Sequence, residues 1–349
     1  MKRTIACFSS YGSGGLGQHF AQIVEEARSQ QQLLQYYSFG SKAEDASGKI
    51  IQIAAKRWLR YTPARYSPGW TSYLECDLFD RAVAEKLTIA EEFQGFVGQS
   101  LHCFQKIRRH GEQTLYLEAA NSHVNNVMRQ HQKAIQQFGM ETSWLNEAQR
   151  KKTLNEYEMA DEIYVASEYT RQSFLAEGIS ASKLVRRNLI VHPRFIPPKK
   201  RLSDGIFRIV YSGSLTVMKG IPLLLEAFTR LPGHNVELTL VGGWATRGMR
   251  RYLQSWLKRD SRIRIAPGDP LPHLQQASVY VHPTYEDGFA YAAAEALACG
   301  VPVIVTEDTG MKEYVQEGIN GHVIPTGNWE ALLEHLTIYR RALLEKYAS

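Results

Sequence analysis

The chain has 349 residues, of which 44% are hydrophobic and 22% charged, and its formal net charge is +6. This length and composition are typical of a globular protein with two domains of ordinary size. No apolar run approaches the length that crosses a membrane, and the first residues, MKRTIACFSSYG, are typical of a strand rather than of a signal peptide. These features exclude a transmembrane protein and predict a cytoplasmic one.

Cysteine usage points to the same compartment. The chain has four cysteines, which are scattered and show no paired metal-ligand spacing: Cys7, Cys76, Cys103 and Cys299. The simplest interpretation is a reduced protein without structural zinc.

The positive charge is concentrated in the first part of the chain. Residues 1–200 hold 26 Lys and Arg against 20 Asp and Glu, a balance of +6, whereas residues 201–349 hold 15 of each. The densest basic and aromatic stretch is KRWLRYTPARYSPGW, residues 56–70. It fits peripheral contact with an anionic membrane surface, or contact with an anionic acceptor, but a solvated helix and loop with some aromatics packed inward is the favoured interpretation. Nucleic-acid binding is not expected, because no recognition-helix or stacking pattern accompanies the charge.

Strand-like and helix-like segments alternate along the first half, which predicts a parallel α/β domain. The expected strands are residues 4–9, 33–39, 114–117 and 162–167. The expected helices are residues 18–28, 74–87, 124–138 and 168–177. A proline-rich linker, RFIPPKK at residues 194–200, then separates a first domain of residues 1–195 from a second of residues 196–349.

A glycine-rich turn, Gly12 to Gly17, follows the first strand. It satisfies a dinucleotide-binding pattern, so an NAD-dependent oxidoreductase is the alternative hypothesis. Such a site requires an acidic residue about 20 residues later to hold the ribose hydroxyls. The sequence there reads Ser38-Phe39-Gly40-Ser41, without an acid.

The second half alternates in the same way. Strands are expected at residues 207–212, 236–241, 262–266, 279–282 and 301–305, and helices at 221–231, 250–258, 290–299 and 329–347. The turn Glu286-Asp287-Gly288 precedes an alanine-rich helix that stops at Gly300. Backbone N–H groups at such a helix start stabilise an anion such as a diphosphate. Asp287 and Glu295, roughly 12 Å apart if helical, could accept hydroxyl hydrogen bonds from two parts of one long ligand.

This segment resembles the C-terminal motif of retaining glycosyltransferases of family four, which have the GT-B fold. The family pattern of an acid, Gly-Phe-Gly and then Glu-Ala-Leu/Met-Ala-x-Gly-x-Pro-Val-Ile stands here as Asp287-Gly288-Phe289-Ala290 and Glu295-Ala296-Leu297-Ala298-Cys299-Gly300-Val301-Pro302-Val303-Ile304. Asp287 replaces the usual Glu, and Ala290 replaces the second Gly. The resemblance implies two Rossmann-like, doubly wound domains that face each other across a cleft.

Three further segments acquire roles through this resemblance. Gly213-Ser214 and Lys219 stand in the loop that resembles Gly-Arg-Leu-x-x-x-Lys-Gly, with Ser214 in place of the arginine. Lys219 and the two amides would bind the diphosphate, or Arg247 would supply a further cation. Gly14 and Gly15 resemble the N-terminal loop that lies against donor and acceptor. His123 is the candidate for the histidine that faces the donor sugar, or equally a packed loop histidine; His102 is a weaker candidate.

The resemblance implies transfer of a sugar from a UDP- or GDP-sugar to a hydroxyl acceptor, with retention at the anomeric carbon. Asp287, with the amides of Gly288, Phe289 and Ala290, would hold the sugar, and Glu295 the ribose. The acceptor would be a glycan, a lipid-linked molecule or a small molecule. No cofactor and no metal are expected, because the chain lacks an Asp-x-Asp arrangement. A catalytically silent sugar-nucleotide-binding protein is a further alternative, suggested by the two substitutions.

Overall fold

The chain folds into two compact units in a computed structural model, which describes residues 1–40, 45–52 and 61–348. Unit 1 comprises Met1–Met128 and Thr142–Ile190, and unit 2 comprises Arg129–Glu141 and Val191–Ser349. The boundary near residue 190 lies close to the predicted one. The assignment of Arg129–Glu141 to unit 2 differs from the sequence prediction. Its physical cause is apolar packing, because Ala134, Ile135 and Phe138 pack in the hydrophobic core of unit 2.

Unit 1 is built on a parallel sheet of seven strands in the order β3-β2-β1-β4-β5-β6-β7. The strands are β1 (Arg3–Cys7), β2 (Leu33–Phe39), β3 (Gly48–Ile51), β4 (Glu92–Phe96), β5 (Thr114–Ala119), β6 (Glu162–Val165) and β7 (Leu184–Arg186). The strand order reverses between β1 and β4, and ligands of such sheets bind at the carboxyl ends of the strands beside this switch point.

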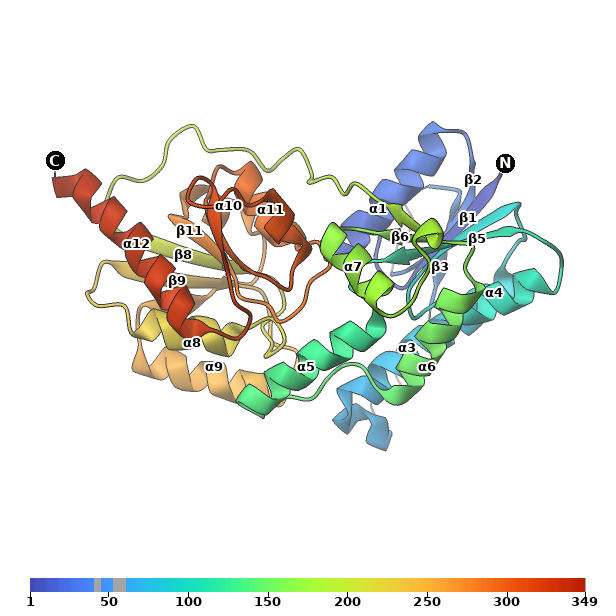
Figure 1. Ribbon diagram of the computed structural model, residues 1–349, viewed down its shortest axis with the longest axis horizontal. Helices are drawn as coiled ribbons and strands as arrows, with labels where there is room; N and C mark the ends of the chain where they lie inside the picture. The colour runs from blue at the N-terminus through green and yellow to red at the C-terminus, as the bar shows by residue number, and fades with distance from the viewer. Residues whose placement is uncertain (41–44, 53–60, 349) are drawn as a thin grey trace. The chain divides into compact units, whose positions relative to one another are not determined.

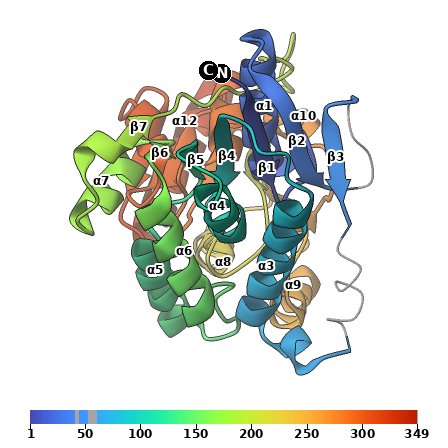
Figure 2. The ribbon, with the colours of Figure 1, turned by 90° about the vertical axis from the view of Figure 1, so that its right-hand side faces the viewer.

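The helices of unit 1 connect these strands. Those in the described residues are α1 (Gly14–Ser29), α3 (Pro68–Lys86), α4 (Leu101–Arg108), α5 (Val124–Phe138, whose second half belongs to unit 2), α6 (Glu147–Met159) and α7 (Glu168–Ala176), with short 3-10 turns η1 (Pro63–Tyr66) and η2 (Ala181–Lys183). Figure 2 shows α3, α4 and α6 side by side, and the three pack directly against one another.

Unit 2 has a parallel sheet of six strands in the order β10-β9-β8-β11-β12-β13. Its strands are β8 (Phe207–Ser212), β9 (Val236–Val241), β10 (Ile263–Ile265), β11 (Val279–His282), β12 (Val303–Thr306) and β13 (Gly321–Ile324). Its helices are α8 (Ile221–Thr229), α9 (Arg247–Arg259), α10 (Leu271–Gln276), α11 (Tyr291–Ala298) and α12 (Trp329–Ala348), with the 3-10 turn η3 (Gly310–Tyr314). The strand order reverses between β8 and β11, so this unit is also doubly wound.

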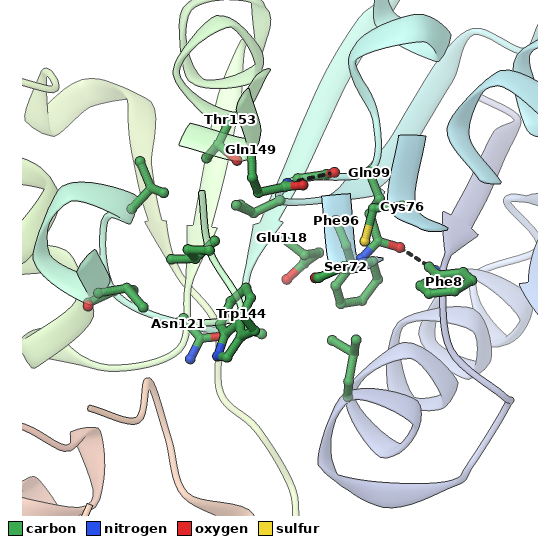
Figure 3. A pocket seen from close by; sticks show the side chains of 18 of the residues that line it. Phe8, Ser72, Cys76, Phe96, Gln99, Glu118, Asn121, Trp144, Gln149 and Thr153 are labelled. Carbon is green, nitrogen blue, oxygen red and sulfur yellow. Dashed lines mark hydrogen bonds between the residues drawn. The ribbon is translucent and has the colours of Figure 1, made fainter. Parts of the chain in front are cut away.

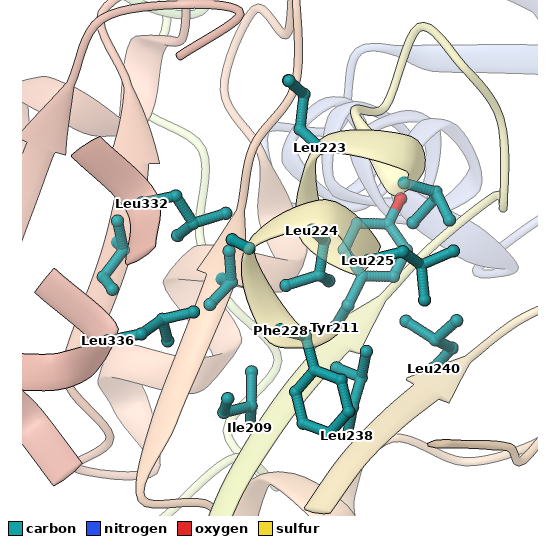
Figure 4. Packing of buried hydrophobic residues seen from close by; sticks show 14 of the residues in the cluster. Ile209, Tyr211, Leu223, Leu224, Leu225, Phe228, Leu238, Leu240, Leu332 and Leu336 are labelled. Carbon is teal, nitrogen blue, oxygen red and sulfur yellow. The ribbon is translucent and has the colours of Figure 1, made fainter. Parts of the chain in front are cut away.

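The core of unit 2 lies between its sheet and the helices α8 and α12. Figure 4 shows Leu224 and Phe228 of α8 packed over Ile209 and Leu238 of the sheet. Leu332 and Leu336 of α12 are buried in the same cluster, and Figure 1 shows α12 beside α8. The last helix predicted from the sequence therefore exists and packs on its own unit.

The basic and aromatic stretch at residues 56–70 is only partly described, since residues 56–60 lie outside the described ranges. In the remainder, the side chains of Tyr61, Tyr66 and Trp70 are exposed. Among the helices in the described part of the chain, none is long and apolar enough to span a membrane.

Candidate functional site

The candidate site of unit 2 lies where β8, β11 and β12 end, at the edge of the sheet where doubly wound domains bind ligands. The loop after β8 carries Lys219, and the turn after β11 carries Asp287. The main chain of Asp287 pairs with the loop after β12, because Asp287 N donates to Asp308 O and Gly310 N donates to Asp287 O. Three loops far apart in the sequence are thus joined at one edge.

Lys219 and Asp287 form an ion pair with 2.7 Å between Nζ and Oδ2. Lys219 Nζ also donates to the Glu286 carbonyl oxygen at 3.2 Å. The side chains of Lys219 and Asp287 are 27% and 20% exposed, so the pair is partly open to solvent. An ammonium group has three N–H donors, and these two bonds use two of them. Among the described residues, the third N–H of Lys219 has no acceptor, so it can donate a hydrogen bond to an incoming anion.

Asp287 also organises the turn in which it lies. Its Oδ1 accepts hydrogen bonds from the N–H groups of Ala290 at 2.8 Å and Phe289 at 3.3 Å, and its Oδ2 lies 3.2 Å from His282 Nε2. Burial alone would raise the pKa of Asp287, but the charge of Lys219 and the hydrogen bond with His282 hold it well below its usual range. Asp287 is therefore an ionised acceptor that orients Lys219. A direct contact of Asp287 with the sugar stays a prediction.

The Phe289 and Ala290 amides predicted to hold the sugar point at the Asp287 carboxylate instead. Ala290 precedes α11 and has φ of 67°, in the left-handed region that favours glycine. The family pattern has glycine at this position. Ala290 is thus a strained residue at the start of the helix.

The glycines of the Lys219 loop allow backbones to approach closely. A Cβ atom at Gly220 would lie 1.8 Å from the Pro283 carbonyl oxygen, so only glycine lets this loop reach the end of β11. The Gly213 N–H donates to Val241 O at 2.9 Å. In this structure the Gly213 amide is therefore committed to the sheet and is not available to a diphosphate, contrary to the sequence expectation. The Ser214 carbonyl accepts a hydrogen bond from Tyr211 OH at 2.9 Å.

Glu141, which sequence reasoning missed, braces this loop. Its Oε2 accepts from Val217 N at 2.6 Å, and its Oε1 accepts from the hydroxyl of Thr246, the N-cap residue of α9. The carboxylate is buried and joins the loop after β8 to the loop after β9. Glu141 lies 76 residues before Val217, so no local motif could have indicated it.

Glu295 lies on α11 and is buried. Burial raises the pKa of the Cys299 thiol, and the negative charge of Glu295 raises it further. The helix begins at Tyr291, so Asp287 stands outside it and the helical estimate of the Asp287–Glu295 separation does not apply. A ribose contact of Glu295 stays a prediction, as does a cationic role of Arg247 at the first position of α9.

The candidates in unit 1 lie in three places. Gly14 and Gly15 form the first turn of α1, where Gly14 has φ of 64°. The ring of His123 is buried against Tyr157 and Phe174, and its Nδ1 accepts from Asn125 N at 3.2 Å. This environment is that of a packed core histidine; a catalytic role of His123 stays a prediction. His102 is part of α4 and bonds to Asp77 Oδ1 at 2.8 Å.

One group of possible metal ligands lies away from the candidate site. Among the described residues, Glu317, His322 and His335 bring their ligand atoms within 4.8 Å of one another. His322 is the second residue of β13 and so lies in the amino-terminal half of that strand, whereas Lys219 and Asp287 follow the carboxyl ends of β8 and β11. This group is therefore not part of the candidate site.

Residues 194–340 match the family described as glycosyl transferases group 1. A capsular polysaccharide biosynthesis glycosyltransferase, CapM of Staphylococcus aureus, is 31% identical over 39% of this chain and 37% of its own length. A D-inositol 3-phosphate glycosyltransferase of Mycobacterium tuberculosis is 25% identical over 53% of this chain and 43% of its own length. The chain thus spans well under half the length of these curated relatives.

Two solved structures share the fold over nearly the whole chain. Sucrose-phosphate synthase from Thermosynechococcus elongatus has a TM-score of 0.73 at 19% identity and covers 98% of this chain and 92% of its own. HepE from Anabaena, solved with UDP and glucose, has a TM-score of 0.65 at 15% identity and covers 97% and 89%. These likenesses confirm the predicted GT-B fold, and no comparison favours the oxidoreductase alternative. The likeness to the family of glycosyl transferases group 1 lies in residues 194–340, all of them in unit 2.

Proposed function

We propose that this protein transfers a sugar from a nucleotide diphosphate sugar to a hydroxyl acceptor, with unit 2 as the donor-binding unit. The observation that carries the proposal is the partly exposed Lys219 ammonium, held at the carboxyl edge of the sheet by Asp287 and Glu286. A fixed cation at this edge stabilises the negative charge that develops on a leaving diphosphate. Relatives support the donor class, because HepE was solved with UDP-glucose.

In this proposal Lys219 contributes a positive charge that the protein holds in place before the substrate binds. Asp287 fixes the ammonium, Thr216 Oγ1 accepts from Lys219 N at 3.2 Å, and Glu141 ties the same loop to α9. A cation that is already oriented needs no reorganisation when charge appears on the diphosphate. The leaving phosphate can itself accept the proton of the acceptor hydroxyl on the face where that hydroxyl attacks. This course retains the anomeric configuration and requires neither a protein nucleophile nor a metal ion.

The test is a panel of UDP- and GDP-sugars together with the free nucleoside diphosphates. A ligand of the folded state raises the apparent melting temperature, so the correct donor base is expected to stabilise the protein in a concentration-dependent way. Release of the nucleoside diphosphate in the presence of acceptor then reports transfer. Absence of both binding and release across the panel would overturn the proposal, whereas binding without any hydrolysis or transfer would favour the catalytically silent protein.

The ribose role of Glu295 is tested in the same assay. Glu295→Gln keeps the size of the side chain but removes its charge, so affinity for the free nucleoside diphosphate is expected to fall by roughly tenfold, the loss of one hydrogen bond to a charged group. An unchanged affinity would remove Glu295 from the ribose site. The exposed Glu330, at the start of α12, provides the matched Glu330→Gln control.

A further inference from the structure

The last helix of unit 2 and the edge strand of its sheet bring two histidines and a glutamate together. Glu317 lies in the turn before β13, His322 lies on β13, and His335 lies on α12. One ring nitrogen or carboxylate oxygen of each lies within 4.8 Å of those of the other two. In the described ranges, no other group of three histidine, cysteine or acidic side chains meets this spacing. The proposed donor site uses none of these residues.

The backbone of the two elements determines how the histidines meet. β13 is the last strand of the six-stranded sheet, and His322 stands opposite Ile304 of β12. His335 and Tyr339 are four residues apart on α12 and therefore share one face of the helix. The His322 ring packs against both, with centroid distances of 4.1 Å to His335 and 5.5 Å to Tyr339. This face of α12 thus presents His335 to the edge strand.

The carboxylate of Glu317 is already oriented towards the group. Its Oε1 lies 2.6 Å from His322 Nδ1, and its Oε2 accepts from Val323 N at 3.2 Å. The turn that carries it is closed by a hydrogen bond from Gly318 N to Gly321 O at 3.0 Å. The side chain of Glu317 is 61% exposed, whereas that of His322 is 14% exposed. An ion can therefore approach the pair from the solvent side of the carboxylate.

His335 has a ring nitrogen that is not in use. Within the described parts of the chain, its Nδ1 has no hydrogen-bond partner. The side chain is half-buried, and burial, together with the positive charge that His322 carries when protonated, lowers the pKa of His335. Its imidazole is therefore neutral near pH 7, and the neutral ring is the form that binds metal ions.

The stacked rings must separate before both bind one ion. The planes of the two imidazoles lie at 25° to each other, whereas a metal ion binds in the plane of each ring. His335 can turn about its Cβ–Cγ bond, because in the described residues no hydrogen bond holds its covered Nδ1, and the turn brings a ring nitrogen to the ion. His322 Nδ1 and Glu317 Oε1 then open from 2.6 Å to about 3.3 Å, the separation of two ligands around a tetrahedral zinc ion.

Two imidazoles and one carboxylate select the class of cation. Imidazole nitrogen is a ligand of Zn²⁺, Cu²⁺ and Ni²⁺, whereas Mg²⁺ and Ca²⁺ take oxygen ligands. Three protein ligands leave one position of a tetrahedral zinc ion for water. The sequence predicted no structural zinc because the cysteines are scattered, but cysteine spacing carries no information on a site made of histidine and glutamate.

We propose that Glu317, His322 and His335 bind one Zn²⁺ ion, with water in the fourth position. The ion joins β13 and the turn before it to α12. Since three segments must be folded together to supply its ligands, the ion stabilises the folded state of unit 2. This role is separate from donor binding, because Lys219 and Asp287 lie at the carboxyl edge of the sheet and His322 lies in the amino-terminal half of its strand.

The choice of metal is tested on the full chain, freed of any histidine tag, by calorimetric titration with ZnCl₂, MgCl₂ and CaCl₂. One Zn²⁺ per chain is expected, without saturable binding of Mg²⁺ or Ca²⁺. Zn²⁺ is also expected to raise the apparent melting temperature in a concentration-dependent way, and EDTA to reverse the rise. Absence of Zn²⁺ binding, or equal binding of Mg²⁺ or Ca²⁺, would overturn the proposal.

Two variants each remove one ligand. His335→Ala and Glu317→Gln are expected to weaken Zn²⁺ binding at least tenfold, because even the loss of a residue that only supports a metal ligand weakens binding by about tenfold. His234→Ala removes an exposed histidine of unit 2 outside the group and is the matched control, with unchanged affinity expected. Circular dichroism confirms folding, and Glu317→Gln, at an exposed side chain, tests the site even if His335→Ala fails to fold. Undiminished Zn²⁺ binding by Glu317→Gln would overturn the proposal.

Hydrogen exchange followed by mass spectrometry locates the ion without relying on affinity. Zn²⁺ is expected to slow exchange of the amides of β13 and α12 in the original protein and in His234→Ala, but not in Glu317→Gln. Slower exchange confined to other segments would mean that the ion binds elsewhere, and the assignment to Glu317, His322 and His335 would be wrong.

Discussion

Each unit of this protein places a lysine against aspartate, and the two clusters differ in how far solvent reaches them. In unit 1, Lys152 Nζ lies 2.8 Å from Asp80 and 3.0 Å from Asp77, and the lysine side chain is 4% exposed. In unit 2, Lys219 lies 2.7 Å from Asp287 and is 27% exposed. The distances are nearly the same, but one ammonium is enclosed by protein and the other still faces solvent.

The difference in exposure distinguishes a lysine whose charge stabilises the fold from one whose charge can bind a ligand. Lys152 of α6 is bonded to α3, and Asp80 of α3 in turn caps α4, so this ion pair joins three helices. A buried charge whose partner is removed is strongly destabilising, whereas a partly exposed one is not. Lys219 has one N–H without an acceptor in the described part of the chain, and it lies at the carboxyl edge of its sheet, where doubly wound domains bind ligands. Loss of Lys152 should therefore damage stability, and loss of Lys219 should damage function.

The largest effect is expected for Lys152→Met, which keeps the length of the side chain and removes its charge. Asp80 would then remain buried without its cation, while Asp77 would keep its ion pair with Arg81 at 2.7 Å, and the free energy of unfolding is expected to fall by about 3–5 kcal/mol. Urea denaturation measures the change. The adjacent, exposed Lys151 gives the control Lys151→Met, for which a change within about 0.5 kcal/mol is expected. Similar values for the two variants would contradict the structural role of the buried pair.

Lys219→Ala is expected to leave most of the stability intact and to lower sugar transfer by about a hundredfold to a thousandfold, the range for removal of one preorganised electrostatic donor. Steady-state release of the nucleoside diphosphate measures the rate, and urea denaturation confirms folding. Lys258→Ala, at an exposed position of α9, controls for the loss of a positive charge from unit 2. Near-normal turnover of a folded Lys219→Ala protein would show that Lys219 does not stabilise the leaving diphosphate.

The candidate site around Lys219 could largely be located from the sequence. Lys219, Asp287 and Glu295 lie in contiguous motifs, because a turn between a strand and a helix is a local structure with local chemistry. The alternation of strand-like and helix-like segments predicted the parallel sheets, and the helix at residues 124–138 was placed correctly.

What the sequence could not predict depends on contacts between distant segments. Periodicity indicated that α5 has an apolar face but not which core that face joins. For the same reason Glu141 was missed, since its partners Val217 and Thr246 belong to other loops. A cavity in unit 1 that is lined by residues between Phe8 and Tyr157 (Figure 3) was missed as well, because the segments that form its wall carry no shared motif.

His131 provides a test of intermediate size for the electrostatics around Lys219. This buried histidine of α5 belongs to unit 2, and burial together with the positive charge of Lys219 lowers its pKa to about 3. An unfolded histidine has a pKa near 6.5, so the folded state disfavours protonation of His131. Its contribution to stability is complete above pH 6.5 and is lost as the pH falls towards 3.

Between pH 6.5 and pH 5 this linkage amounts to about 2 kcal/mol, at 1.36 kcal/mol for each pH unit. The free energy of unfolding of His131→Gln is therefore expected to fall less steeply over this range than that of the original protein. Buried His282 also has a lowered pKa and contributes in the same direction, so the remaining slope is not zero. Exposed His234 provides the control His234→Gln. If the free energy of unfolding falls with the same slope against pH in the original protein and in His131→Gln, protonation of His131 is not the cause of the pH dependence.

The smallest effect concerns the backbone at the start of α11. Ala290 has φ of 67°, a conformation that is unfavourable by about 1–2 kcal/mol for a residue with a Cβ atom. Ala290→Gly removes this strain but adds about 0.5–1 kcal/mol of unfolded-state entropy, so a net stabilisation of about 0.5–1 kcal/mol is expected.

Ala294→Gly, on the same helix, is the matched control and is expected to destabilise by about 1 kcal/mol, because helical φ offers glycine no advantage. Opposite signs for one substitution at two neighbouring alanines would identify backbone strain as the cause. The turn that Ala290 closes also holds Asp287, whose carboxylate accepts the Ala290 N–H and orients Lys219. A gain in stability without a change in turnover would mean that the strain is local to the helix start. A change in turnover would show that this strain reaches Lys219 through Asp287.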